Sequence, residues 1–469
     1  MAVMTPAHYL PTSMTVILLG VVVSSIFLRW LLEFWNMRHI PGPFQAKITN
    51  FWMASKLWNC EDFRDIALDL HAKYGPVVRY GPNRVLLGDL SAVSAVFNTK
   101  HPLVKSESYE VAFQAVNGKL ISSLATTRDE ARVSALKKQI ISAFTTTAIL
   151  DYEHHIDHNI KSLMKYLEED GPDVNIAKWC IFFTFDTICR IAFSDDQGFM
   201  DKQSDLGNTL QGARERFSHW HTWQSLPKLE KLLFKNRFAS RVTGTSLLAK
   251  LAGERVQKRI EDGGIGAHSD LLDRYLQASI RDPVTFDKST ILGLVISIIH
   301  AGAETTASTL SIVLHYLLTN PQAMKKLREE IYAANLSSPP PWLSVNKLQY
   351  LEAAVKESMR MNPLLQDPIE RDVPESGMEI SGVFIPGGTI VAINVHALSR
   401  DPTIWGDDFA VYRPERWLEA GEAQISKMER ANLSFSAGRR MCIGQHIAWI
   451  EMKKFLSELL NRFDVGPAD

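Results

Sequence analysis

A ten-residue loop near the C-terminus constrains this chain more than any other feature. Residues 435–444 read Phe-Ser-Ala-Gly-Arg-Arg-Met-Cys-Ile-Gly, and a helical hydrophobic pattern over residues 446–460 follows. Cys442 therefore lies just before a helix N-terminus, where unpaired N–H groups and the helix dipole favour a thiolate. Gly438 and Gly444 allow the backbone to pass close to a flat ligand. Five residue types at this spacing recur by chance in about one chain in ten thousand, which disfavours an incidental cysteine in a glycine-rich turn.

The spacing Phe-x-x-Gly-x-Arg-x-Cys-x-Gly resembles the haem-ligand loop of the cytochrome P450 family. The resemblance implies that Cys442 is the proximal, axial thiolate of haem b. It also implies that Phe435 packs beneath the haem near the sulfur and that Arg440 pairs with a haem propionate. The implied fold is mostly α-helical with small β-sheets (α+β), with a long central helix over the haem. A thiolate ligand pushes electron density onto iron and favours O–O cleavage, which is why this chemistry uses cysteine.

The longest helical pattern runs over residues 287–318 and closes at Asn320-Pro321. At the usual rise per residue such a helix is about 45 Å long and crosses a whole domain. It contains Ala301-Gly302-Ala303-Glu304-Thr305, which resembles the oxygen-activation motif of the same family. Small residues at 301 and 302 would let a ligand approach the backbone, and Thr305 is placed to bond an i−4 carbonyl. By resemblance, Glu304 and Thr305 relay protons during oxygen activation; the alternative for Glu304 is a satisfied core carboxylate.

A second helical segment carries Glu357 and Arg360 at i, i+3 spacing, which puts both charges on one face. Alone, this spacing is typical of an ordinary surface ion pair. Downstream, Pro414-Glu415-Arg416-Trp417 resembles the Pro-x-Arg-aromatic segment of the family. The resemblance implies a buried structural triad of Glu357, Arg360 and Arg416 that holds the haem loop.

Two further haem contacts are expected by resemblance. Arg371, in Glu-Arg-Asp-Val-Pro before a β-rich region, resembles a propionate-binding arginine of the family. Lys137 stands where the third helix of the family offers an arginine to the other propionate, and Val133 stands where many members have Trp or His. This departure removes one expected haem contact.

The N-terminus predicts a membrane anchor. Residues 10–34 are apolar except for Arg29 and Glu33, and a transmembrane helix needs roughly 20 mostly apolar residues. Basic residues follow this stretch and none precedes it, so the expected topology is a single pass with the catalytic domain facing the cytosol. The family resemblance implies that the membrane is that of the endoplasmic reticulum. The alternative, a cleaved signal peptide, lacks a basic start and a small-residue cleavage site. We therefore divide the chain into an anchor and linker (1–40) and one haem-thiolate domain (41–469).

The composition and charge limit the classes of molecule that this chain can bind. The net charge is −1, and no dense block of Lys and Arg could follow a nucleic-acid backbone. Three of the four cysteines, Cys60, Cys180 and Cys189, show no disulfide or metal-ligand spacing and are expected to be small buried residues. The chain shows no flavin or reductase segment of its own, so by family analogy electrons come from NADPH–cytochrome P450 reductase, with cytochrome b5 as a further donor.

Smaller elements follow from local patterns. Residues 61–74 have the period of an amphipathic helix. Residues 77–80 and 84–87 flank Gly-Pro-Asn and predict a hairpin. The region from there to residue 318 reads as helical, and residues 378–391 read as β-rich, with turns at Ser381-Gly382 and Pro386-Gly387.

The resemblance implies NADPH-driven insertion of one oxygen atom from O2 into a small hydrophobic substrate, by hydroxylation, O-demethylation or a related oxidation. His-Ile-Pro-Gly-Pro-Phe (39–44) and Lys-Tyr-Gly-Pro-Val-Val-Arg (73–79) look most like fungal pisatin demethylase-like members, which implies secondary-metabolite biosynthesis. Only 27 residues follow Cys442 (469 − 442), so a shortened C-terminal end without the pocket-lining hairpin of the family is expected. Two alternatives stay open: a catalytically impaired haem-binding paralogue, and a haem-thiolate isomerase or dehydratase, which would not need the proton relay.

Overall fold

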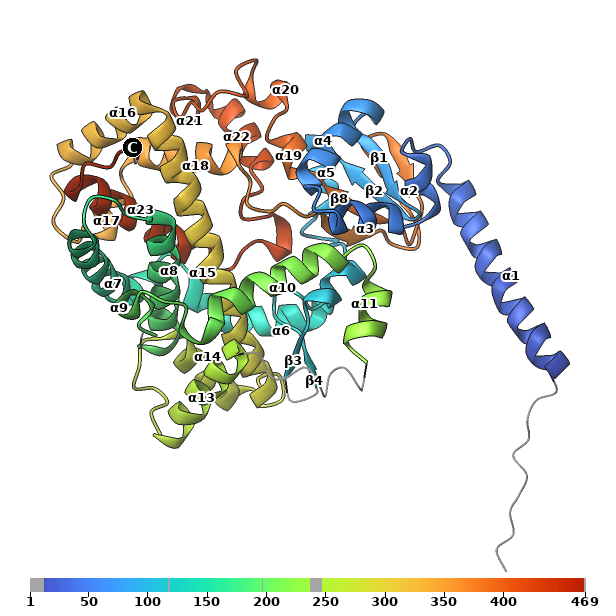
Figure 1. Cartoon of the computed structure of the whole chain (residues 1–469), viewed down its shortest axis with the longest axis horizontal. Coiled ribbons are helices and arrows are strands. Elements are labelled where there is room, and N and C mark those ends of the chain that lie inside the picture. Colours follow the sequence, from blue (N-terminus) through green and yellow to red (C-terminus); the bar gives the residue numbers. More distant parts are fainter. Residues whose placement is uncertain (1–11, 117–118, 196, 237–246, 468–469) are drawn as a thin grey trace, which may run out of the picture.

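The computed structural model describes residues 12–116, 119–195, 197–236 and 247–467. A large helical body lies beside a smaller part built on a β-sheet, and one N-terminal helix projects away from both (Figure 1). The fold is mostly helical with small sheets, as the sequence predicts. The helices of the larger body are α6 (Glu130–Ile140), α7 (Ile149–Asp170), α8 (Ile176–Phe193), α9 (Phe199–Lys202), α10 (Thr209–Trp223), α11 (Pro227–Phe234), α13 (Leu247–Glu261), α14 (Leu271–Arg281), α15 (Lys288–Thr319), α16 (Pro321–Ala333), α17 (Trp342–Val345), α18 (Gln349–Met361) and α23 (Gln445–Arg462).

The smaller part surrounds a four-stranded sheet of order β1-β2-β8-β5, made of β1 (Val77–Gly81), β2 (Arg84–Leu87), β8 (Ile390–Ile393) and β5 (Ile369–Asp372). The predicted hairpin is confirmed as the antiparallel β1–β2 pair. β2 pairs in parallel with β8, with Val85 opposite Val391, so strands far apart in sequence form one sheet. Short helices cover the sheet and continue toward the helical body: α2 (Phe44–Ile48), α3 (Phe51–Trp58), α4 (Phe63–Tyr74), α5 (Leu90–Val96), α19 (Val395–Leu398), α20 (Pro402–Trp405), α21 (Arg416–Glu419) and α22 (Glu422–Ala431).

The central helix α15 confirms the longest pattern in the sequence. Asp287 caps its N-terminus by accepting a hydrogen bond of 2.8 Å from the Thr290 backbone N–H. The helix packs along α8, whose side chains are nearly all buried. Among the described residues, α15 is the helix long and apolar enough to cross a membrane, but more than half of its most apolar stretch is buried in the protein. Its hydrophobicity is therefore that of a core helix.

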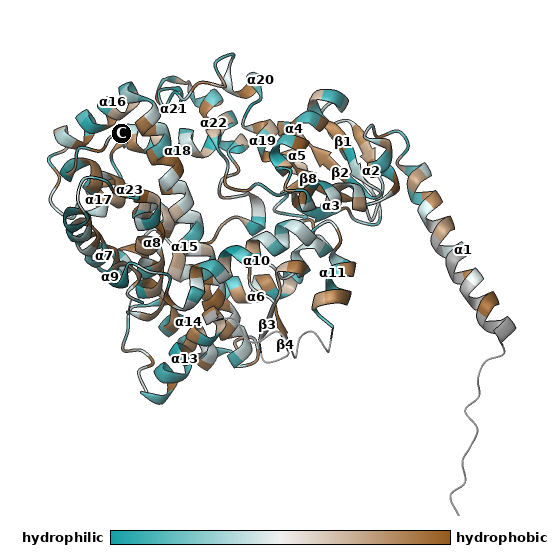
Figure 2. Ribbon diagram, in the orientation of Figure 1, coloured by the Kyte–Doolittle hydropathy of each residue, from teal (hydrophilic) through white to brown (hydrophobic). Residues whose placement is uncertain are grey.

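The N-terminal helix α1 (Thr12–Asn36) is mostly apolar and stands clear of the folded body (Figures 1 and 2). Residues 10 and 11 of the predicted anchor lie outside the described residues. Its junction with the body is ordered by Met37 and Ile40, which are both buried. The Arg79 guanidinium also donates to the Phe34 carbonyl at 3.2 Å.

Two local predictions were wrong, and one strand was not predicted. Arg371 precedes the β-rich residues 378–391 as expected, and it lies within the unpredicted strand β5, which pairs with β8 and completes the sheet. Residues 114–116 and 119–121 form a small hairpin, β3–β4, in a region expected to be helical. Cys60 is exposed, with a φ of 59°, at the end of α3, whereas Cys180 and Cys189 are buried as expected. Three-residue strands and a turn cysteine carry too little periodicity for sequence reasoning.

Candidate active site

The loop that carries Cys442 forms a turn ahead of α23, and a backbone hydrogen bond fixes its shape. A 3-10 turn (η4, Gly438–Arg440) leads into it, and the Cys442 backbone N–H donates to the Phe435 carbonyl at 2.9 Å. Gly438 has a φ of 67°, and a Cβ there would collide with the Phe97 carbonyl, so only glycine fits. A Cβ at Gly444 would meet no protein atom within 4 Å. The loop thus packs closely against the protein at Gly438 and has free space beside it at Gly444.

Cys442 combines residual exposure with a desolvated thiol. The residue retains accessible surface. Burial raises the pKa of its thiol, while the Gly444 backbone N–H and the charge of Lys137 act to lower it. Phe435 is half-buried beside this loop, with its ring 6.2 Å from that of Trp449.

Four cationic side chains gather on one side of this loop. Arg440 is the best satisfied, since it donates to Glu130 at 2.8 Å and to the carbonyls of Leu124 and Thr127. Arg371 is buried and donates to the Glu370 carbonyl at 2.8 Å and to the Tyr109 hydroxyl at 3.4 Å.

The other two cations of this cluster are lysines. Lys137 donates to the Arg439 carbonyl at 2.6 Å. Lys105, which sequence reasoning missed, is 8% exposed, donates to the Ala125 carbonyl at 2.6 Å and lies 4.1 Å from the Tyr109 ring centroid. Burial lowers the pKa of Lys105 well below its usual value, and nearby Arg371, Arg440 and Lys137 lower it further. Lys105 belongs to no motif; only the backbone bridge between Lys105 and Arg371 places it here.

The charge of this cation cluster (Lys105, Lys137, Arg371, Arg440) is not balanced by protein. Glu130 is its one carboxylate partner within salt-bridge distance among the described residues, and the Glu130 Oε2 atom is buried without a hydrogen bond. Burying excess charge is costly unless a counter-charge arrives. The cluster therefore suits a ligand with more than one acidic group.

The accessible face of α15 carries the second group of predicted residues. Thr305 donates its hydroxyl to the Ala301 carbonyl at 2.6 Å, as its i, i+4 position predicts. Ala301 is exposed although α15 is a core helix, so no protein side chain covers this turn completely. Gly302 faces α8, and a Cβ there would meet the Ile188 side chain at 2.7 Å. This glycine therefore allows close packing against α8. The expectation that it would let a ligand approach the backbone was wrong.

Glu304 is an incompletely paired acid on the same helix. Its side chain is 15% exposed, and its Oε1 atom is buried without a hydrogen-bond partner. The Arg214 guanidinium approaches at 3.7 Å but is itself 68% exposed. Burial raises the pKa of Glu304, opposed by Arg214. A satisfied core carboxylate, the alternative for this residue, does not match this geometry.

The structure also brings Glu357, Arg360 and Arg416 together. Glu357 is fully buried and accepts from Arg360 at 2.7 and 2.9 Å and from Arg416 at 2.9 Å. The Trp417 indole N–H and the Arg413 backbone N–H complete its shell. Both guanidiniums also donate to backbone carbonyls, so this network is internally satisfied and has no free face for a substrate.

Comparison with known proteins decides the family. The model of the family described as "Cytochrome P450" matches residues 41–469. The chain belongs to the cytochrome P450 family. It is 33% identical to a cytochrome P450 monooxygenase of Aspergillus terreus, over 96% of this chain and 94% of that protein. It is also 33% identical to cytochrome P450 monooxygenase cicH of Emericella nidulans (96% and 91%) and 30% identical to mfmA of Annulohypoxylon moriforme (96% and 91%). The enzyme class is thus an oxidoreductase of the monooxygenase type.

The P450 cofactor is haem with thiolate-ligated iron, supplied with O2 and with electrons from a reductase. The residues described above fit this group. An accessible thiol at the start of α23 matches the iron, and the excess of buried cations beside it matches the two haem propionates. Accessible Ala301 on α15 leaves room for a flat ring.

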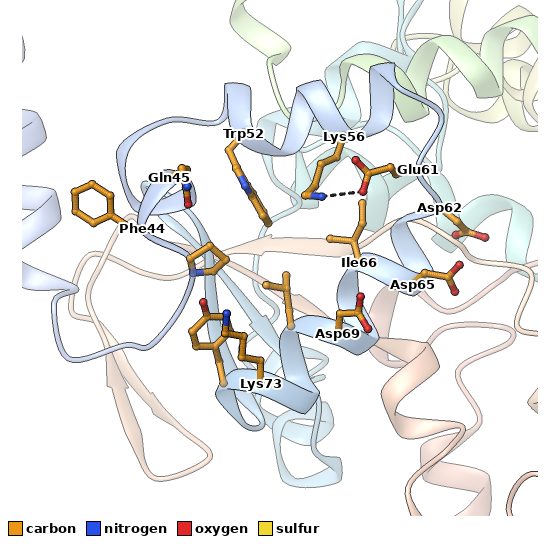
Figure 3. Close-up of a pocket in the computed structure, with 13 residues that line it drawn as sticks. Phe44, Gln45, Trp52, Lys56, Glu61, Asp62, Asp65, Ile66, Asp69 and Lys73 are labelled. Atoms are coloured by element: carbon orange, nitrogen blue, oxygen red, sulfur yellow. Dashed lines mark hydrogen bonds and ion pairs between the residues drawn. The ribbon is translucent and has the colours of Figure 1, made fainter.

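A separate hollow of about 550 Å³ lies between α2, α3 and α4 (Figure 3). Its walls carry Asp62, Asp65 and Asp69, and a Lys56–Glu61 ion pair of 2.7 Å crosses one side. None of the residues predicted for the haem site lines it. We assign no part of the chemistry to this hollow.

Proposed function

We propose that this chain is a haem-thiolate monooxygenase in which Cys442 is the axial ligand of the iron. The observation that carries the proposal is the accessible Cys442 thiol beside a buried cation cluster with too few carboxylates of its own. Arg440, Arg371 and Lys137 hold the propionates, and we add Lys105 to this set. Phe435, Gly438 and Gly444 shape the loop around the sulfur.

When bound, the haem would supply the activation of O2 and the insertion of one of its two oxygen atoms into a substrate C–H bond, while the other atom leaves as water with two electrons from the reductase and two protons. The protein contributes proton delivery. Glu304 has a pKa raised by burial, so it holds a proton more readily than an exposed glutamate. Its Oε1 atom accepts no hydrogen bond from the described residues, which leaves it ready to exchange one with water. Thr305 already donates to Ala301, so its oxygen is free to accept the next hydrogen bond of the relay.

The triad of Glu357, Arg360 and Arg416 holds the segment that precedes the haem loop. Its members are buried and bond only to protein, which is typical of a structural role. This leaves Glu304 and Thr305 as the catalytic residues and Ala301 as the residue that gives the haem space.

The substrate is proposed to be a small hydrophobic molecule of fungal secondary metabolism, oxidised by hydroxylation, O-demethylation or a related reaction. The fungal source of the similar monooxygenases supports this assignment. Electrons are proposed to come from NADPH–cytochrome P450 reductase, with cytochrome b5 as a further donor. Exposed Arg439, close to Lys137 and Lys138, offers positive charge to an acidic partner surface.

Helix α1 is proposed to be the single transmembrane anchor of a protein in the endoplasmic reticulum membrane. Its apolar side chains Val16, Phe27 and Trp35 support this proposal because more than half of each is exposed. Deletion of residues 1–36 should move the protein from the pellet to the supernatant after high-speed centrifugation of a lysate. A deleted chain that stays in the membrane fraction would show that another surface anchors it.

The test of the proposed function is the absorbance of the reduced enzyme under carbon monoxide. We expect a Soret band at the red-shifted thiolate position, and we expect Cys442→Ser to lose it while exposed Cys60→Ser keeps it. A wild-type spectrum without this band contradicts the assignment of Cys442.

Glu304→Gln tests the proton relay, since it keeps the size of the side chain and removes the acid. NADPH and O2 consumption should continue while product formed per NADPH falls on the order of 10²-fold, with hydrogen peroxide as the alternative product. Turnover without NADPH or O2 would instead support an isomerase or dehydratase.

A further inference from the structure

The inner face of α10 approaches the central helix above Ala301. This face presents Ala213, Arg216, Phe217 and Trp220, whose spacing of three to four residues places them on one side of the helix. The Phe217 ring lies 4.8 Å from the ring of His300, one residue before Ala301. The charge of Arg216 acts on the same imidazole. Arg216 and His300 are thus neighbours, and His300 directly precedes the exposed Ala301.

Arg216 is a desolvated cation without a counter-charge. Burial lowers the pKa of its guanidinium to about 10, and no acidic group opposes that effect. Other arginines of low exposure bond to carboxylates or carbonyls: Arg84 to Glu370, Arg259 to Asp270 and Arg371 to the Glu370 carbonyl. For Arg216, no hydrogen bond or ion pair is found within the described part of the chain. Holding a charge in this way is costly unless a ligand supplies the anion.

His300 adds an unsatisfied polar atom. Its Nε2 atom is buried without a hydrogen-bond partner. Burial, together with Arg216, lowers the pKa of His300 to about 3, so the imidazole is neutral at physiological pH. A neutral imidazole carries one N–H donor and one acceptor nitrogen and no charge, and in the tautomer protonated at Nε2 this atom is the donor. The pair therefore carries a single positive charge, which one monoanionic group balances.

Glu304 stands one turn further along α15, at i, i+4 from His300, and so faces the same space. Burial raises the pKa of Glu304, so this carboxyl takes up a proton more readily than an exposed glutamate, and in its protonated form it donates a hydrogen bond. The Arg214 guanidinium lies 3.7 Å from the Glu304 carboxylate and is itself 68% exposed, so solvent screens its charge.

We propose that Arg216 and His300 form a carboxylate-recognition site, and that the substrate is a hydrophobic molecule bearing one carboxylic acid group. The inference rests on the proposed function, because it places the substrate between α10 and α15 on the accessible side of Ala301. The guanidinium supplies charge-assisted hydrogen bonds to the carboxylate, and the imidazole N–H supplies a further donor. The aromatic rings of Phe217 and Trp220 offer apolar contact to the rest of the molecule.

The test measures binding to the full-length haem-loaded enzyme with matched ligands. 2-Naphthoic acid and dodecanoic acid are each compared with their primary amide and methyl ester. Affinities are taken from the spin-state shift of the ferric Soret band and, independently of that signal, from equilibrium dialysis. We expect at least one of the acids to bind about tenfold more tightly than its amide, the ratio expected of one charge-assisted interaction.

Variants then assign the preference to its residues. Arg216→Gln should bring the acid-to-amide ratio close to one while affinity for the amide stays the same, and Arg216→Lys should keep part of the ratio. His300→Phe, which retains ring contact with Phe217, should lower the ratio to a smaller extent. Lys325→Gln, which removes a positive charge from a side chain 78% exposed on α16, should leave it unchanged.

The inference is overturned if both acids bind no better than their amides and esters, or if Arg216→Gln leaves the ratio unaltered. The reduced carbon monoxide spectrum of every variant separates this failure from that of the proposed function. A normal thiolate band with no acid preference contradicts only the carboxylate site. Loss of the band in the wild-type protein contradicts the haem assignment itself.

Discussion

Glu357 is the residue whose loss should most clearly destabilise the fold. Its carboxylate is fully buried between Arg360 and Arg416, whose side chains are 1% and 3% exposed. In Glu357→Gln the shape is retained, but one carboxylate oxygen becomes an NH2 group. If the NH2 group replaces Oε2, it faces the Arg360 Nε–H and the Trp417 indole N–H, so two buried donors lose their acceptor.

The expected cost is about 3–5 kcal/mol, the range for removing one partner of a buried ion pair. The cost in unfolding free energy is not doubled by the presence of two arginines, because each arginine keeps other hydrogen-bond acceptors. Arg360 donates to the Ser399 and Phe409 carbonyls, and Arg416 donates to the Trp405 carbonyl and to Asp408. The measurement is urea unfolding followed by circular dichroism, with haem content recorded for each variant.

Two further variants decide whether the network is the cause. Glu329→Gln makes the same chemical change at a surface i, i+4 pair with Lys325, where the side chains are 63% and 78% exposed, and should alter stability by less than about 0.5 kcal/mol. The double variant Glu357→Gln, Arg416→Gln should cost less than the sum of the single variants by about 1–3 kcal/mol. A Glu357→Gln protein within about 1 kcal/mol of wild type would refute the reasoning.

Three other changes have signs set by the structure. Gly438→Ala should destabilise the haem-free protein by about 1–3 kcal/mol in thermal unfolding, since its φ is positive and a carbonyl blocks the Cβ, whereas Gly444→Ala, with open space, should be near neutral. Lys105→Met should stabilise the haem-free protein, because it removes charge repulsion within the cation cluster. The same variant should lose haem to apomyoglobin faster than the wild type. A variant that is more stable without haem and also retains haem longer would contradict the role of Lys105. Asp367 raises the pKa of His221 across a 2.7 Å contact. The stabilisation from this pair is complete below about pH 6.5, the ordinary histidine pKa, and is lost as the pH rises through the raised pKa of His221. In urea unfolding, Asp367→Asn should therefore cost about 0.5–1 kcal/mol near pH 6 and nothing near pH 9.

The long periodic elements could be predicted from sequence because each is specified locally. The 32-residue helix α15 carries its own cap at Asp287 and an apolar surface, and α23 follows the Cys442 loop as expected. The sheet could be predicted only in part. The parallel pairing of β2 with β8 joins residues about 300 positions apart, and nothing in either four-residue strand specifies the partner.

The site divides in the same way. Cys442, Glu304 and Thr305 could be proposed from the sequence because fixed motifs carry them, and their roles stay predictions. Lys105 was not, because its role depends on a bridge to Arg371 and on packing against Tyr109, both of which are tertiary contacts. Gly302 shows that a motif can also mislead, since it predicted that a ligand would approach this glycine, whereas the structure shows close packing against α8.

Buried charge in this protein is of two kinds, and the difference separates scaffold from site. Around Glu357, each cation bonds to a carboxylate or carbonyl, so the network needs nothing from outside and its removal costs stability alone. Around Lys105 the cations outnumber their carboxylates, and at Arg216 no partner is found among the described residues. A fold gains nothing from burying charge that it does not balance. Such positions are therefore expected where an anion arrives with a ligand: two propionates beside Cys442, and one carboxylate beside His300.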